Sequence, residues 1–433
     1  MALEIGKVRN VGVVGHGGVG KTSLVEALLF ATGALTRLGR VDDGSTTTDF
    51  DPDEIKRKIS INTAVAYGDW KGHRINFVDT PGYGDFIADA RAGLRVVEAA
   101  LVVVDAVAGV QVQTEKVWKF ATEYSLPRAV VVNRLDRERA DFYRTVESLG
   151  SRLKGRLVPL QIPVGEEAAF RGYVDLGRMK AIVHADGKSS ETNIPDDLAA
   201  RANAYRETLV EAAAETDDEL LSKYLEEGSL GEAEVLEALR KGILETKIIP
   251  VLCAAATKGI GSVGLLELIV NEFPSPADRG DAEGTDLKGK QPGRRAPDAK
   301  APVTALVFKT LSDPHVGKLS LFRVMSGTLR ADSTLLNPLR GARERMGHVS
   351  WLQGKTQKNV EALGPGEIGV VAKLKETQTG DTLCDEGQPF ELPRITFPEP
   401  AISFAIQPKS RGDEDKISSA LARIAEEDPT VHY

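Results

Sequence analysis

The first part of the chain alternates short apolar runs with longer amphipathic segments. Residues 99–105 are apolar enough to form a strand buried on both faces, as in parallel sheets. The expected strands cover residues 11–14, 61–67, 74–78, 99–105, 128–132 and 248–253, with a hairpin turn at Gly68 and Asp69. The expected helices cover residues 23–30, 86–97, 113–124, 142–152 and 263–273. This alternation predicts a doubly wound, mainly parallel α/β sheet across residues 1–275.

The alternation is interrupted twice. The polar residues 36–58 have little periodicity, which inside a compact domain predicts a mobile functional loop. Before the last expected strand, residues 157–183 have the pattern of short strands, and residues 196–244 are mostly helical and rich in glutamate. We therefore expect an insertion at about residues 157–247. Its charged helices are more typical of solvated faces than of binding sites.

Residues 276–302 interleave Pro, Gly, Asp and Lys without an apolar period, which predicts a linker. Residues 303–390 then contain short alternating runs separated by turn signals, the pattern of a small β-barrel. The expected barrel strands cover residues 304–309, 318–326, 334–336, 344–348 and 368–374.

The last segment, residues 391–433, predicts one strand at 401–407 and one helix at 413–427. A lone strand and helix cannot bury their apolar faces, so we expect the start of an incomplete third domain of the α+β class. A fragment and a natural truncation both fit this pattern.

The composition limits the cellular compartment and the binding partners that can be expected. The 55 basic and 63 acidic residues give a net charge of −8, which argues against a general nucleic-acid coat. Cys253 and Cys384 lack partners at metal-ligand spacing and are expected as buried thiols. The sequence has no signal-peptide pattern and no apolar run of membrane-spanning length, so we expect a cytoplasmic protein without membrane contacts. We also expect a monomer in solution.

A phosphate-binding loop lies between the first expected strand and helix. It consists of Gly15, His16, Gly17, Gly18, Val19, Gly20, Lys21 and Thr22, followed by Ser23. This order matches a glycine, four free positions and Gly-Lys-Thr. Glycines let successive N–H groups turn inward toward an anion, and the helix dipole adds to the attraction. Lys21 would contact the β- and γ-phosphates and Thr22 would ligate Mg²⁺. The strand before and the helix after argue against an accidental glycine-rich turn.

Two further motifs follow expected strands, where open α/β sheets bind ligands. Asp79 would hold Mg²⁺ through water, and the N–H of Gly82 would meet the γ-phosphate. The Asp136 carboxylate can accept both N1–H and N2–H of guanine, a donor pair that adenine lacks. Asn133 would support the base edge, and the stem of Arg134 would lie along the ring.

The loop after residue 253 would complete the base pocket. A backbone N–H near Ala255 and Ala256 would face guanine O6. This signal is weak by itself, because short runs of alanine are common.

The order and spacing of these motifs resemble the translational GTPases, and among them the elongation factor G family. The segments that carry the resemblance are residues 15–22, 61–86, 133–136, 312–318, 322–324, 326–329, 379–384, 397–400 and 407–409. The resemblance implies a phosphate-loop GTPase domain with an inserted subdomain, then a β-barrel, then the opening of a third domain. It also implies GTP, GDP and Mg²⁺ as ligands, with Ser60 joining Thr22 and Asp79 at the metal.

Several positions depart from the family pattern. Tyr83 stands where the family has a histidine that positions the attacking water, and a phenol has no ring nitrogen. Gly18 replaces an aspartate and Lys58 a glycine, while Ser60 keeps the hydroxyl of the usual threonine. Arg134 replaces a lysine. These changes indicate a divergent, second-type paralogue rather than the main translocase.

The resemblance implies a ribosome-stimulated GTPase, with Lys21, Gly82 and Tyr83 at the reacting phosphate and the barrel on the small ribosomal subunit. One alternative is a ribosome-binding module that holds GTP and barely hydrolyses it, which Tyr83 motivates. Ribosome-protection proteins and class-three release factors are neighbouring alternatives. A nucleic-acid-binding protein that uses the barrel is disfavoured by the acidic balance. The ribosomal step and the role of the insertion are left open.

Overall fold

The computed structural model describes residues 3–185, 187–313, 316–400, 402–408 and 413–433. Its internal contacts divide the chain into two compact units. The α/β unit comprises Arg9–Gly84 and Val97–Pro274, and the β-rich unit comprises Met1–Val8, Asp85–Val96 and Ser275–Tyr433.

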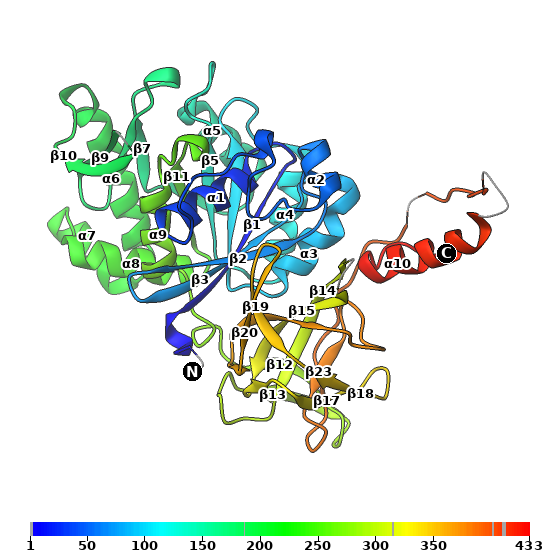
Figure 1. Cartoon of the computed structure of the whole chain (residues 1–433). Helices are drawn as coiled ribbons and strands as arrows, with labels where there is room; N and C mark the ends of the chain where they lie inside the picture. Colours follow the sequence, from blue (N-terminus) through cyan, green and yellow to red (C-terminus); the bar gives the residue numbers. More distant parts are fainter. Residues whose placement is uncertain (1–2, 186, 314–315, 401, 409–412) are drawn as a thin grey trace. The chain divides into compact units, whose positions relative to one another are not determined.

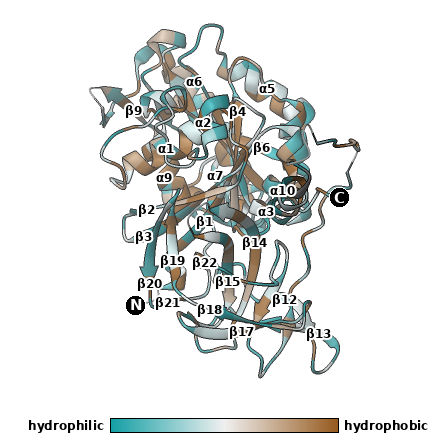
Figure 2. Ribbon diagram, turned by 45° about the vertical axis from the view of Figure 1, so that its right-hand side comes forward, coloured by the Kyte–Doolittle hydropathy of each residue, from teal (hydrophilic) through white to brown (hydrophobic). Residues whose placement is uncertain are grey.

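A seven-stranded sheet forms the centre of the α/β unit (Figure 1), in the order β2-β3-β1-β4-β5-β11-β6. The strands are β1 (Val8–Gly15), β2 (Ala64–Trp70), β3 (His73–Asp79), β4 (Ala99–Asp105), β5 (Arg128–Asn133), β6 (Arg156–Pro159) and β11 (Ile248–Cys253). Strands β1, β4, β5, β11 and β6 pair in parallel, and β2 and β3 form an antiparallel hairpin. All residues of β4 are buried, and nearly all are hydrophobic (Figure 2). The predicted doubly wound fold is confirmed.

Helices lie between these strands in the chain, and one follows the last strand. They are α1 (Lys21–Ala31), α2 (Pro52–Arg57), α4 (Val112–Glu123), α5 (Phe142–Arg152) and α9 (Ser262–Asn271). Of these, α1, α4 and α5 pack against the sheet. Helix α5 has the predicted bounds, and α1, α4 and α9 start or end within two residues of their predicted ends. The helix expected at residues 86–97 is the shorter α3 (Ile87–Leu94), which belongs to the β-rich unit.

The turn of the β2–β3 hairpin differs from the prediction. Strand pairing continues from Ala64 with Asp79 to Trp70 with His73, so the turn lies at Lys71 and Gly72. Both turn residues have positive φ, 47° and 77°. Gly68 is instead inside β2, where it pairs with Ile75. A Cβ at this position would collide with the side chain of Thr32. The glycine marks close packing and not a turn.

The segment predicted as an insertion forms its own small sheet and helices. The sheet has the order β10-β9-β8-β7 and consists of β7 (Gln161–Val164), β8 (Gly172–Asp175), β9 (Lys180–Ala185) and β10 (Lys188–Thr192). The helices are α6 (Asp196–Ala214), α7 (Asp218–Glu227) and α8 (Glu232–Leu244). The short strand β6, which precedes them, pairs with β11 and therefore belongs to the main sheet.

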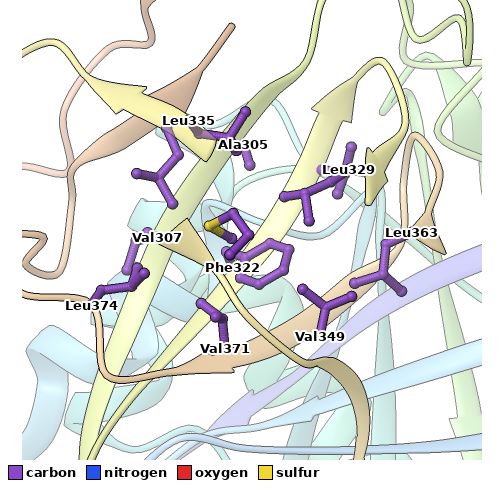
Figure 3. Close-up of a cluster of buried hydrophobic side chains, with 12 residues drawn as sticks. Ala305, Val307, Phe322, Leu329, Leu335, Val349, Leu363, Val371 and Leu374 are labelled. Atoms are coloured by element: carbon purple, nitrogen blue, oxygen red, sulfur yellow. The ribbon is translucent and has the colours of Figure 1, made fainter. Parts of the chain in front are cut away.

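Antiparallel strands build most of the β-rich unit. An eight-stranded sheet has the order β18-β17-β23-β14-β15-β22-β19-β20, and β16 pairs with β21 separately. The strands are β14 (Thr304–Asp313), β15 (Gly317–Ser326), β16 (Leu329–Arg330), β17 (Ser333–Asn337), β18 (Ala342–Met346), β19 (Val349–Gln353), β20 (Thr356–Val360), β21 (Ala362–Leu363), β22 (Ile368–Ala372) and β23 (Thr382–Cys384). Their inward side chains meet in one core around Phe322, Val307 and Val371 (Figure 3). Both cysteines are buried free thiols, as predicted.

The predicted linker contains a β-hairpin. Strands β12 (Ala282–Asp286) and β13 (Gln291–Arg295) pair with each other, and β12 also pairs with β24 (Phe390–Glu391). The hairpin itself has few apolar residues, and it packs against Phe390, which is distant in the sequence. A Cβ on Gly284 would lie 2.5 Å from the Phe390 ring, and the Arg295 guanidinium lies 4.7 Å from the ring centroid. No local apolar period could reveal strands that pack on a distant phenylalanine.

The predicted strand at residues 401–407 is wrong. Residues 402–408 lie in neither a helix nor a strand, and Ala401 is outside the described residues. Ile402, Phe404 and Ile406 are 71%, 82% and 57% exposed. Alternating apolar residues become a strand only when a neighbouring strand accepts their hydrogen bonds, and no described segment pairs with this one.

The last helix, α10 (Glu414–Glu427), matches the predicted helix. Pro314 and His315 of a predicted turn, and Lys409 of a segment that carried the resemblance, are outside the described residues. Across the described part of the chain, every helix is too short or too polar to cross a bilayer.

Replacing Phe322 by alanine should destabilise the β-rich unit. Its side chain is fully buried, and its loss leaves a cavity that the surrounding strands can fill only in part. We expect the free energy of unfolding to fall by about 3–5 kcal/mol. Urea unfolding followed by circular dichroism measures the change. The matched variant Leu225→Ala removes a side chain that is 75% exposed and should change stability by less than about 0.5 kcal/mol. Coincident transitions for the two variants would contradict the assigned core.

Candidate guanine nucleotide site

A cavity of about 240 Å³ lies where β1, β3 and β5 end. Predicted site residues that line it are Gly17, Gly18, Gly20, Lys21, Thr22, Ser23, Ser60, Gly82, Tyr83, Asn133, Arg134, Asp136 and Ala256. Of the other predicted site residues, His16, Val19 and Ala255 are next to lining residues in the chain. Asp79 interacts with the lining residues Lys21 and Thr22, and Gly15 is the last residue of β1, just before His16. The structure thus brings together motifs that are more than a hundred residues apart in the sequence.

The phosphate-binding loop joins β1 to α1. Gly20 is the residue before the helix and has φ 92°, a conformation that glycine adopts without strain. A Cβ on Gly20 would also lie 2.6 Å from Nδ2 of Asn133, so the loop and the end of β5 approach closely. The N–H groups at the start of α1 are available to an anion because no side chain caps them.

Lys21 places a buried ammonium group at this helix start. The residue is 5% exposed, and its Nζ donates a hydrogen bond to the carbonyl oxygen of His16 at 2.9 Å. Burial lowers the pKa of Lys21, while the nearby Asp79 and Asp49 carboxylates oppose that shift. A buried ammonium has three donors, so phosphate oxygens beside the single carbonyl would satisfy the group.

Several side chains place hydroxyl and carboxylate oxygens close to Lys21. Thr22 Oγ1 lies 3.0 Å from Ser60 Oγ and 3.5 Å from Asp49 Oδ1. Asp79 is 2% exposed, and its Oδ2 accepts a hydrogen bond from Thr48 Oγ1 at 2.7 Å. In the described structure its other oxygen, Oδ1, is buried without a hydrogen-bond partner.

This oxygen set fits Mg²⁺. Burial, and next the charge of Asp49, raises the pKa of Asp79. A divalent cation would compensate the two buried carboxylates and favour their charged forms. Mg²⁺ prefers oxygen ligands and keeps several waters, so the unpaired Oδ1 of Asp79 is suited to hold a metal-bound water.

Asn133 connects the two sides of the cavity. Its Nδ2 donates to the carbonyl oxygen of Val19 at 2.9 Å, and its Oδ1 accepts the N–H of Ala256 at 3.0 Å. The side chain is 1% exposed, so both bonds are shielded from water. One amide thereby ties the phosphate-binding loop to the loop after β11.

The base side differs from the prediction in one respect. The N–H of Ala256 does not face the cavity, because Asn133 accepts it, and the N–H of Ala255 is donated to Ile260. The adjoining Thr257 lines the cavity instead. The acceptor of the Ala256 N–H, Asn133, is distant in the sequence, so no local pattern reveals this hydrogen bond.

Asp136 and Arg134 lie on the same side of the cavity. The Asp136 carboxylate is 3.4 Å from Lys258 Nζ, a residue that the sequence did not single out. Arg134 has φ 66°, and its guanidinium donates to Asp105 at 2.8 Å. This ion pair holds the Arg134 stem, which also lines the cavity.

Sequence reasoning missed most of the residues between positions 36 and 62 that line the cavity. They include Arg40, Val41, Asp42, Asp49, Lys58 and Ile59, and Arg137 and Thr257 join them from elsewhere. The sequence predicts a mobile loop in this region. In the structure, two buried glutamates hold the segment at both ends.

Glu26 and Glu54 are each 2% exposed. Glu26, in α1, accepts the N–H groups of Gly39 at 3.2 Å and Thr47 at 2.9 Å. The sequence offered one signal for this contact: a glutamate inside the apolar run of the helix. A buried carboxylate needs hydrogen-bond partners, so its position predicts contacts with polar groups elsewhere.

Glu54, in α2, accepts the N–H groups of Asp51, Ile61 and Asn62 at 3.1, 2.9 and 3.0 Å. The first of these bonds belongs to a capping box with Asp51, whose spacing is readable in the sequence. Burial raises the pKa of Glu54 to about 7, although these three bonds favour the carboxylate. Glu54 therefore holds the chain on the C-terminal side of Ser60.

Comparisons with known proteins agree with this geometry. The family model for the elongation factor Tu GTP binding domain matches residues 6–275, that for elongation factor G domain 2 matches 302–386, and that for elongation factor G domain III matches 397–433. Elongation factor G of Thermotoga sp. strain RQ2 is 43% identical over 99% of this chain, and that of Thermotoga neapolitana is 42% identical.

A crystal structure of a protein from Thermus thermophilus has a TM-score of 0.87 and 35% identity, over 98% of this chain and 61% of that one. The chain spans 62% of the length of the two Thermotoga relatives. The matched models, the relatives and the motif geometry agree: the chain belongs to the elongation factor G family of translational GTPases.

Proposed function

We propose that the chain binds GTP with Mg²⁺ and hydrolyses it as a switch in translation. The observation that carries the proposal is the cavity in which the Lys21 ammonium, the Thr22 and Ser60 hydroxyls and the Asp136 carboxylate meet. Each group matches one part of the ligand: the phosphates, the metal and the guanine edge. The printed names of the relatives support the role in translation.

The chain's own residues would position the phosphates and stabilise their charge. Lys21, held by the His16 carbonyl, donates to the phosphates, and the N–H of Gly82 meets the terminal one. Thr22 and Ser60 would hold the metal through their hydroxyl oxygens, and Asp79 would hold it through water. Mg²⁺, when bound, neutralises charge on the phosphate oxygens, which is a large part of phosphoryl-transfer catalysis.

Loss of the terminal phosphate would release Ser60 and Gly82 from it and relax the two segments. We propose the ribosome as the partner, in the cytoplasm, because the relatives are elongation factors. The proposed organisation is a nucleotide-binding domain at 1–275 with an insertion at 157–247, a connecting segment at 276–302, a β-barrel at 303–390 and the start of a third domain at 391–433.

A second candidate is a ribosome-binding module that holds GTP with little hydrolysis. Tyr83 favours it, because a phenol lacks the ring nitrogens through which an imidazole accepts and donates protons. The two candidates differ in whether the ribosome stimulates release of phosphate.

Replacing Asp136 by asparagine should change the base preference. Asparagine offers one acceptor and one donor, so guanine loses a bond worth about 1–3 kcal/mol, or about 5- to 150-fold in affinity, and xanthine gains a matching face. Equilibrium titration with GDP, XDP and ADP measures this. Asp281→Asn, at an exposed position, is the matched control. A wild-type protein without preference for guanine over adenine would refute the proposed site.

Replacing Tyr83 by histidine should raise the rate of phosphate release with ribosomes. A group that orients the attacking water contributes about 10²–10⁴-fold, which bounds the gain. Single-turnover assays with and without ribosomes measure it, with Tyr83→Phe as the control that lacks a ring nitrogen. Absence of ribosome-stimulated release from the wild type would reject the hydrolysing switch in favour of the binding module.

Replacing Glu54 by alanine should weaken binding of a GTP analogue more than binding of GDP. Three partly buried N–H groups would lose their acceptor, and the chain around Ser60 would loosen. We expect the ratio of the two affinities to fall about tenfold, with faster tryptic cleavage at Arg57 and Lys58. Glu237→Ala, at an exposed position in α8, is the control. Equal losses for both nucleotides would mean that Glu54 only supports folding.

A further inference from the structure

Tyr83 rests on the backbone of Gly17. A Cβ built on Gly17 would lie 2.8 Å from Cζ of Tyr83, 2.9 Å from Cε2 and 3.0 Å from Cε1. The hydroxyl-bearing end of the ring therefore occupies the volume that any side chain at position 17 would need. Tyr83 as a whole is 40% exposed, so the contact with Gly17 leaves much of the side chain accessible to solvent.

The backbone of Gly17 does not itself require glycine. Gly15, Gly18 and Gly20 of the same loop have positive φ values of 148°, 75° and 92°, whereas Gly17 is not among the residues with positive φ. The positive φ that disfavours an alanine is therefore not present at this position. What excludes a side chain here is the ring of Tyr83.

The residue before Tyr83 approaches the same loop. A Cβ on Gly82 would lie 2.6 Å from the carbonyl oxygen of His16 and 2.7 Å from the nitrogen of Gly17. Gly82 and Tyr83 thus lie against consecutive residues of the phosphate-binding loop. The contacts of Gly82 and Tyr83 with the phosphate-binding loop restrict the position of the turn after β3, because closely packed atoms cannot shift without a collision.

We propose that Gly17 and Tyr83 are a matched pair, in which the missing side chain at position 17 sets the position of Tyr83 and thereby of the Gly82 N–H at the terminal phosphate. Gly17 is a positioning residue in this pair. The inference rests on the proposed function and adds the cause of one departure from the family. A tyrosine in place of histidine is accommodated because the loop beneath it has no side chain.

The experiment is a double-mutant cycle on nucleotide release. The proteins are wild type, Gly17→Ala, Tyr83→Ala and the double variant, with Gly17→Ala also made in a Tyr83→Phe background. Stopped-flow fluorescence measures the release rates of labelled GDP and of a labelled, non-hydrolysable GTP analogue. The ratio of the two rates reports contacts to the terminal phosphate, and GDP release serves as the internal reference.

We expect Gly17→Ala to raise the relative release rate of the GTP analogue about tenfold, because the displaced ring draws Gly82 away. The same change should have less than about a twofold effect in the Tyr83→Ala background, and its full effect with Tyr83→Phe, which keeps the ring. Gly150→Ala, in α5 with no atom within 4 Å of its Cβ, is the matched control and should leave the ratio unchanged.

Equal effects of Gly17→Ala with and without the ring, or no effect in the wild type, would overturn the pairing. If Gly17→Ala alone folds poorly, recovery of its thermal midpoint by Tyr83→Ala supports the pair, and failure to recover contradicts it. A wild-type protein that binds neither labelled nucleotide would reject the proposed function itself, an outcome distinct from additivity.

Discussion

Charged side chains are buried at the carboxyl end of the central sheet, and the rest of the site is arranged around them. Lys21, Asp49 and Asp79 are each 5% exposed or less, and they lie together where β1 and β3 end. Isolated buried charges are costly, so such a group is stable only with partners of opposite sign. The protein supplies one carbonyl to Lys21 and one hydroxyl to Asp79. A triphosphate with a divalent cation would supply the remaining partners, which is why we propose this cluster as the nucleotide site.

The surrounding contacts keep this cluster in one geometry. Asn133 joins the phosphate-binding loop to the loop after β11 through two buried hydrogen bonds. Glu26 and Glu54 hold the segment that carries Ser60 through five backbone N–H groups. Both arrangements use a side chain to satisfy distant backbone groups, and buried networks of this kind favour a single conformation. The loop segments are therefore ordered by the protein, while their contacts to a terminal phosphate would be reversible.

The turn after β3 combines family geometry with a local departure. Gly82 lies against the phosphate-binding loop, and Tyr83 lies on the bare backbone of Gly17. The absence of a side chain at position 17 leaves the volume that the Tyr83 ring occupies. Dense packing makes substitutions at the two positions interdependent, since two side chains cannot occupy one volume.

The sequence by itself determined the elements whose signals are local. The run at residues 99–105, helix α5 and strand β11 have the predicted bounds, because hydrophobic period and flanking breakers act over a few residues. The phosphate-binding loop was readable for the same reason, since its donors come from consecutive residues.

Features that depend on residues distant in the sequence became clear only from the tertiary structure. The hairpin at β12 and β13 depends on Phe390, the alternating residues 402–408 form no strand without a neighbour, and the N–H of Ala256 turns toward Asn133. Glu54 holds the chain beside Ser60 only because the fold brings Ile61 and Asn62 to its carboxylate. A pattern along the chain indicates which side chains are expected to be buried. The fold determines which groups cover them or form hydrogen bonds with them.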